Sequence, residues 1–123
     1  MAYFYSVRGW LEVEPEQFER LIAVVQWIQS DQSQSSEKAL YAAGWCWQTT
    51  LINWRCYVFY GAEMQGSGLV FFQEMLDWAI AANLNLSGYF HARGEDGCRN
   101  QAYRITQDHL QIIKLEGLIP ENP

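Results

Sequence analysis

Three cysteines and two histidines are the side chains in this sequence that could bind a metal ion. Structural zinc sites pair such ligands at short spacings, as in Cys-x-x-Cys. Cys46, Cys56 and Cys98 are separated by 10 and 42 residues, and His91 and His109 form no short-spaced pair. The spacing therefore predicts no metal site and no bound cofactor.

The same residue types could supply a nucleophile and its base. Cys98 follows the turn Gly94-Glu95-Asp96-Gly97 and His91 precedes it, so the thiol, the imidazole and the two acidic side chains of the turn could meet in a hairpin. The spacing matches no local signature of nucleophilic catalysis, and turn formation alone explains the glycines and Asp96. We therefore assign no catalytic residue from the sequence.

Composition favours a protein partner over nucleic acid. The 123 residues carry eight Lys and Arg against fourteen Asp and Glu, for a net charge of −6. Nucleic-acid binding depends on Lys and Arg that neutralise phosphates, whereas an acidic domain is attracted to a basic protein. No secretory leader or membrane span is predicted, and the odd number of cysteines fits reduced thiols in the cytoplasm.

The segment 44–61, GWCWQTTLINWRCYVFYG, concentrates the aromatic residues. It holds three of the six tryptophans together with two cysteines and an arginine. Trp, Tyr and Arg are enriched in the hot spots of protein interfaces, although aromatic residues at strand spacing are also common in cores. The face on which these side chains lie decides between the two interpretations.

Hydrophobic periodicity predicts the strands and helices that position these aromatic side chains. Residues 3–13, 39–48, 53–60, 86–93, 98–105 and 109–115 read as strands, and residues 15–30 and 69–83 read as helices, the second with Ser67 as N-cap. The polar segment 30–38 is predicted to be a loop and 117–123 a loose tail. The chain is expected to be one domain over residues 1–123.

The predicted order, β-α-β-β-α-β-β-β, indicates an α+β fold. Its first six elements correspond to a ferredoxin-like core, in which two helices cover one face of an antiparallel sheet, followed by an extra hairpin. A more strongly curved sheet and a meander with helices at its ends are the alternatives. The ferredoxin-like arrangement leaves one sheet face uncovered unless a partner or the extra hairpin folds over it.

The register of strand pairing determines which side chains lie on each face of the sheet. If Cys46 pairs with Cys56, then Trp45, Trp47, Arg55 and Tyr57 lie on the open face, and Cys46, Trp54 and Cys56 pack beneath the helices. Alternation places Trp10 and Glu12 on the same open face. The predicted partner-binding residues are Trp10, Trp45, Trp47, Arg55 and Tyr57, with charge supplied by Glu12, Glu95 and Asp96.

Two alternatives remain open. A pocket between the sheet and its extra hairpin, lined by Trp and Tyr, could bind a small molecule or act as an enzyme site. Alternatively, Tyr57 and Phe59 are spaced two residues apart on one strand, as the base-stacking aromatics of an RNA-recognition sheet are. The oligomeric state could be a monomer or a homodimer.

The chain resembles immunity proteins of bacterial contact-dependent inhibition and other polymorphic toxin systems. The resemblance lies in the small size, acidity and α+β layout, and in the runs Tyr5–Glu12 and Asn53–Gly61. It implies a cytoplasmic protein that binds and neutralises a cognate toxin domain, a basic one such as a nuclease. It assigns no role to any individual residue.

Overall fold

β1 (Phe4–Val13) is the strand around which the sheet of this computed structural model is arranged. The structure describes residues 3–31 and 35–116. β1 is followed by a 3-10 turn (Pro15–Gln17), α1 (Phe18–Ser30), α2 (Ser36–Ala42), β2 (Trp45–Trp47), β3 (Cys56–Gln65), α3 (Gly66–Ala81), β4 (Ser87–Gly94), β5 (Arg99–Thr106) and β6 (His109–Glu116).

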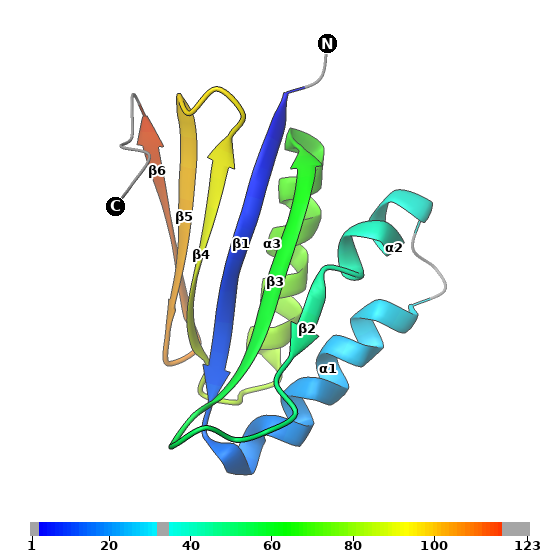
Figure 1. Cartoon of the computed structure of the whole chain (residues 1–123), viewed down its shortest axis with the longest axis vertical. Helices are drawn as coiled ribbons and strands as arrows, with labels where there is room; N and C mark the ends of the chain where they lie inside the picture. Colours follow the sequence, from blue (N-terminus) through cyan, green and yellow to red (C-terminus); the bar gives the residue numbers. More distant parts are fainter. Residues whose placement is uncertain (1–2, 32–34, 117–123) are drawn as a thin grey trace.

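The fold is α+β, with a six-stranded antiparallel sheet and three α-helices. The strand order is β2-β3-β1-β4-β5-β6, and each neighbouring pair is antiparallel. Figure 1 shows the helices on one side of the sheet, behind the strands. The other face carries no helix, and β5 and β6 extend the sheet to one side of α3.

Alternation along β1 separates these two faces. Val7, Leu11 and Val13 are buried under the helices, whereas Arg8 and Trp10 point to the opposite face and are exposed. Side chains alternate at period two in a strand, so pairing with β3 and β4 extends this division to both neighbours. The strand predicted over residues 3–13 is therefore present, with one buried and one mixed face.

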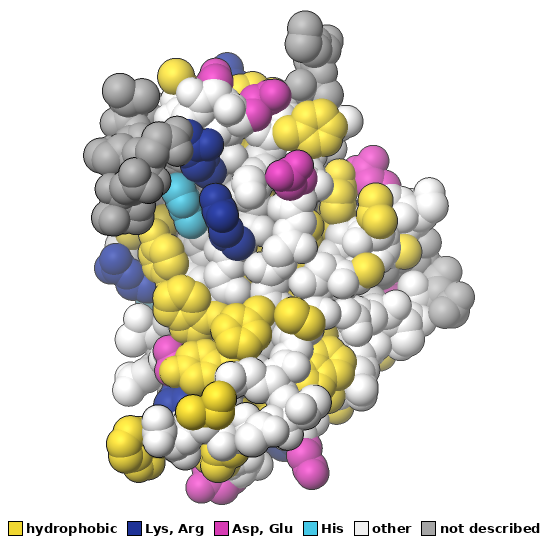
Figure 2. Space-filling view, in the orientation of Figure 1, with side chains coloured by type: hydrophobic (Ala, Val, Ile, Leu, Met, Phe, Trp, Pro, Cys, Tyr) yellow, Lys and Arg dark blue, Asp and Glu magenta, His cyan; other side chains and the backbone are white. Residues whose placement is uncertain are grey.

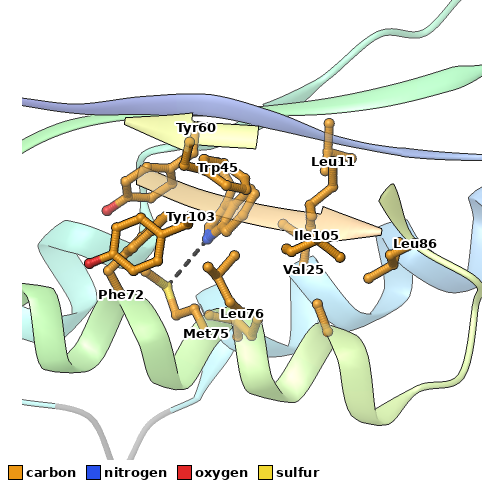
Figure 3. Packing of buried hydrophobic residues seen from close by; sticks show 14 of the residues in the cluster. Leu11, Val25, Trp45, Tyr60, Phe72, Met75, Leu76, Leu86, Tyr103 and Ile105 are labelled. Atoms are coloured by element: carbon orange, nitrogen blue, oxygen red, sulfur yellow. Dashed lines mark hydrogen bonds between the residues drawn. The ribbon is translucent and has the colours of Figure 1, made fainter. Parts of the chain in front are cut away.

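The core lies between the sheet and the helices. Phe72, Met75 and Leu76 of α3 are fully buried and face Phe90 and Tyr103 of the sheet. Figure 3 shows Trp45 among them, with its indole Nε1 donating to Sδ of Met75 at 3.2 Å. Burying an aromatic side chain of this size removes a large apolar area from water, so this cluster contributes strongly to stability.

The strand predicted over residues 39–48 is wrong for most of its length. Ser36–Ala42 is helix α2, and strand structure is limited to Trp45–Trp47. The Ser35 side chain caps the helix by accepting a hydrogen bond from the Lys38 amide at 3.2 Å. Ala39, Leu40 and Ala42 favour a helix, and Tyr41 and Ala42 are buried against the core. The predicted element order therefore lacks one helix.

Other boundaries also differ from the prediction. Within the predicted loop 30–38, Ser30 ends α1 and Ser36 begins α2, while residues 32–34 lie outside the described residues, as does the predicted tail 117–123. β3 continues to Gln65, beyond the strand predicted over 53–60. Ser67 is not the N-cap of α3, because the helix already begins at Gly66 with Gln65 at the cap position.

The predicted pairing of Cys46 with Cys56 is wrong as well. Cys46 lies opposite Phe59, and Trp45 and Trp47 lie opposite Tyr60 and Val58. Cys56 is buried and Cys46 is exposed, so the two cysteines are on opposite faces of the sheet. This register places Trp45 and Trp47 on the helix side, where Trp45 is only 4% exposed.

Hairpin turns stand at both ends of β5, and the first of them lies at the turn predicted over residues 94–97. Gly97, between β4 and β5, has a φ of 75°, which glycine adopts without strain. Between β5 and β6, Gln107 and Asp108 have φ values of 49° and 65°. Two consecutive left-handed residues give the turn whose twist matches an antiparallel hairpin. The Asp108 carboxylate also accepts hydrogen bonds from the amides of Asn85 and Leu86, which anchors the hairpin beside the start of β4.

A candidate binding surface on the exposed sheet face

Four aromatic side chains form a row across three adjacent strands of the helix-free face. Trp10 of β1 lies directly opposite Phe59 of β3 on one side and Tyr89 of β4 on the other. Tyr57 precedes Phe59 on the same side of β3, and their rings stack 6.0 Å apart with an interplanar angle of 7°. The rings of Trp10 and Tyr89 are also 6.0 Å apart. We call Tyr57, Phe59, Trp10 and Tyr89 the aromatic row.

The aromatic row is accessible to a partner. Phe59 is 38% exposed and Trp10 is 36% exposed, and the two tyrosines are partly exposed. Figure 2 looks onto this face and shows hydrophobic side chains extending from its middle toward its lower end. A contiguous exposed apolar patch of this kind marks an interaction site more often than isolated surface residues do.

A cationic group borders the aromatic row toward the end of the sheet where β1 begins. Arg8 lies opposite His91, and Arg93 follows two residues later on the same face of β4. Arg104 of β5 lies opposite Tyr89. Lys and Arg side chains and a histidine accordingly cluster in the upper half of Figure 2. Despite its net negative charge, the chain thus presents arginines on this face.

His91 is held toward its neutral form at this position. Burial lowers its pKa below the ordinary value of 6.5, and the positive charges of Arg8 and Arg93 lower it further. An interaction with the Asn100 side chain acts in the opposite direction. His91 Nε2 and Asn100 Oδ1 are both buried, and neither has a partner at good hydrogen-bond geometry among the described residues. A proton on His91 would therefore place a third positive charge beside those of Arg8 and Arg93.

Arg55 occupies the opposite end of the face, where β3 begins. Its Nη1 donates to Glu14 Oε1 at 2.8 Å and its Nε donates to Glu12 Oε2 at 3.3 Å. Its Nη2 donates to the Glu12 carbonyl at 3.4 Å. The guanidinium thus ties the start of β3 to the end of β1, beside Tyr57, which lies opposite Glu12.

Trp10, Glu12, Arg55 and Tyr57 therefore lie together at one end of the exposed face, as the alternation predicts. Trp45 and Trp47 do not join them, because the β2 register turns both toward the helices. Trp45 packs 4.9 Å from Tyr60 and 5.9 Å from Phe90 between ring centroids, so it belongs to the core. These two tryptophans are removed from the predicted contact set.

Glu95 and Asp96 lie at the far end of the sheet. Glu95 accepts a hydrogen bond from the Phe4 amide at 2.9 Å, and Asp96 accepts one from the Tyr3 hydroxyl. That hydroxyl and the Cys98 amide lower the pKa of the Asp96 carboxyl. β1 has ten residues between these two ends, about 30 Å of strand. Glu95 and Asp96 therefore stabilise the β4–β5 turn and are separate from the aromatic row.

Two residues of the aromatic row are absent from the contact set that the sequence predicts. Phe59 and Tyr89 complete the aromatic row, and their alternation with Tyr57 and Trp10 was the available signal. The predicted position of Trp54 beneath the helices is wrong, because this side chain is 79% exposed in the connection between β2 and β3. Its position could not follow from strand alternation, because residues 48–55 form an irregular connection with one isolated bridge.

The residues that suggested other chemistry are dispersed. Among residues 3–31 and 35–116, no group of three or more His, Cys, Asp and Glu side chains could hold a metal ion. Cys98 borders a surface recess of about 480 Å³ together with Tyr5, Arg99 and Lys114, without any tryptophan. This recess differs from the Trp-lined pocket that the small-molecule hypothesis predicts. No described helix is both long and apolar enough to span a membrane.

Comparisons with known proteins assign this chain to no family. No protein-family model matches the chain, and neither a curated protein nor a solved structure is significantly similar to it.

Proposed function

We propose that this chain is a non-catalytic binding protein whose partner is a cognate bacterial toxin domain, which it neutralises as an immunity protein in the cytoplasm. The supporting observation is the aromatic row, which stands exposed on a sheet face without helices. Trp and Tyr with neighbouring Arg are the side chains that dominate binding energy at protein interfaces. A monomer or homodimer built on a ferredoxin-like core is part of this proposal.

Charge at the end of the row favours a basic partner. Glu12 and Glu14 lie beside Tyr57 and share the single cation Arg55, which leaves one net negative charge there. Glu16 and Glu19 follow in the turn and helix that continue from β1. Complementary charge of this kind accelerates association and selects the partner. A basic toxin would therefore contact the aromatic row and this acidic end together.

A rescue experiment tests this function. The polypeptide encoded beside this gene is expressed in a bacterial host, alone and together with the chain, and viable counts are compared. The proposal expects toxicity that the chain relieves and a purified complex of the two. Trp10→Ala should lose both effects, whereas Trp27→Ala, an exposed tryptophan on α1, should retain them. Failure of the unaltered chain to bind or protect would reject the proposal.

Binding of single-stranded RNA is a second candidate, favoured by one specific observation. In an RNA-recognition sheet, aromatic side chains on adjacent strands stack bases, and here Trp10 of β1 is directly opposite Phe59 of β3. Arg8 is two residues from Trp10 on β1 and Arg104 lies opposite Tyr89, and basic side chains beside stacking aromatics are typical of single-stranded nucleic-acid binding surfaces. This candidate expects salt-sensitive binding of a mixed oligonucleotide pool. No binding at low salt would eliminate it.

A further inference from the structure

An apolar tip projects from the end of the sheet where β1 ends and β3 begins. It consists of Leu51, Ile52 and Trp54, which are 51%, 59% and 79% exposed. Figure 1 shows the connection between β2 and β3 passing beneath the lower end of β1. Three large apolar side chains in four residues remain in water here, and burying each of them against a partner would favour binding.

The backbone of the tip forms a closed turn. Ile52 and Arg55 form a bridge that closes a turn around Asn53 and Trp54. Asn53 has a φ of 66°, in the left-handed region that asparagine tolerates better than most residues. The turn therefore holds the flanking apolar side chains without support from the core.

Two carboxylates fasten this turn to β1. Arg55 closes the turn and donates to both Glu12 and Glu14, as described above. The side chain of Arg55 is 27% exposed, so this clamp is partly shielded from water. A preorganised loop loses less conformational entropy on binding than a mobile one, which increases the affinity that its apolar side chains can supply.

We propose that the apolar tip inserts into an apolar pocket of the protein partner, and that this pocket has a basic rim. The inference rests on the proposed function and identifies the anchor of that interface. The tip is continuous with the aromatic row, because Arg55 contacts Glu12 and Glu12 lies opposite Tyr57. A partner covering the lower end of the sheet would meet both surfaces at once.

Charge beside the tip favours a protein pocket over a lipid surface. Glu12, Glu14 and Arg55 sum to one negative charge, and the Glu14 side chain is 57% exposed. Anionic lipid surfaces attract apolar segments that carry excess Lys or Arg, and they repel this arrangement. Figure 2 also shows acidic side chains at the lower end of the molecule. Basic groups around an apolar pocket would complement them.

Calorimetric titration of the full chain with the purified polypeptide encoded beside its gene, which is the proposed toxin, tests the inference. Trp54→Ala and Leu51→Ala are compared with Leu40→Ala, which removes an equally apolar, 70% exposed side chain from α2. Circular dichroism and thermal unfolding check that each variant folds. We expect Trp54→Ala to raise the Kd at least tenfold, Leu51→Ala to raise it severalfold, and Leu40→Ala to leave it unchanged.

Three outcomes would overturn the inference. Tip variants that bind within twofold of the parent, while Phe59→Ala binds poorly, would reject the anchor and leave the proposed function standing. No binding by the parent chain would reject both. Binding of the parent to vesicles of 70% phosphatidylcholine and 30% phosphatidylglycerol, lost in Trp54→Ala, would assign the tip to lipid instead of a protein pocket.

Discussion

Trp10 lies directly opposite Phe59 across the β1–β3 pair, on the sheet face that carries no helix. Directly opposite side chains in an antiparallel pair are close enough to act as one unit. Trp10 also neighbours Tyr89, and Phe59 stacks with Tyr57, so this pair joins the two halves of the aromatic row. Its two members should therefore contribute cooperatively to binding.

A double-mutant cycle measures this cooperation. Trp10→Ala and Phe59→Ala should each weaken binding of the proposed toxin partner by tenfold or more, about 1.4 kcal/mol, because both lie centrally in the row. The double variant should lose less than the sum, since each single change already disturbs the shared contact. Phe4→Ala alters a similarly exposed phenylalanine at the far end of the face and should bind normally. Equal losses from Phe4→Ala and Phe59→Ala would contradict the assignment.

The sequence places Trp10 on the correct face because β1 is long and strictly alternating. It could not place Trp45, because β2 has three residues and its register depends on pairing with β3 across the irregular segment 48–55. The segment from Ala39 to Ala43 has small and apolar residues that fit a helix as well as a strand. Local capping by Ser35 and burial of Tyr41 decide between them, and burial is a tertiary effect.

Trp45 is the tryptophan that we expect to matter most for stability. Trp45→Ala should lower the free energy of unfolding by about 3–5 kcal/mol, because it leaves a cavity between Tyr60, Phe90 and Met75. Trp54→Ala removes an exposed side chain and should change the free energy of unfolding by less than about 0.5 kcal/mol. Urea denaturation of the two variants makes the comparison. Similar losses in both would show that Trp45 is not a core residue.

The His91 environment predicts a loss of stability in mild acid. Its pKa is lowered in the folded state, so below the ordinary value of 6.5 the unfolded chain takes up a proton more readily. Stability should therefore fall as the pH decreases from 7.5 to 5.5. His91→Gln should reduce that fall, whereas His109→Gln, at the exposed β5–β6 turn, should not. Thermal unfolding across this pH range checks the effect, and parallel curves for parent and His91→Gln would refute it.

Asp108 should stabilise the C-terminal hairpin in two separable ways. Its carboxylate accepts the amides of Asn85 and Leu86 at 2.9 Å and 2.6 Å, and its φ is 65°. Asp108→Gly keeps the backbone conformation accessible and should cost roughly 2 kcal/mol from the lost hydrogen bonds. Asp108→Ala should cost a further ~1 kcal/mol, because alanine disfavours the left-handed region. Urea denaturation measures the stability of both variants. Equal stabilities would show that the left-handed backbone conformation of residue 108 adds no cost for alanine.

The clamp on Arg55 should control the order of the apolar tip more than the stability of the fold. Arg55→Met keeps an aliphatic chain but loses both ion pairs, so amide hydrogens of residues 51–55 should exchange several times faster. The free energy of unfolding should fall by no more than about 1 kcal/mol, since the Glu14 side chain is 57% exposed and solvent screens its charge. Exchange measured by mass spectrometry on peptides covering residues 48–56 reports the first effect. Lys38→Met removes the Lys38–Glu74 pair elsewhere and should leave these peptides unchanged. Unaltered exchange in Arg55→Met would show that the turn keeps its conformation without the ion pairs to Glu12 and Glu14.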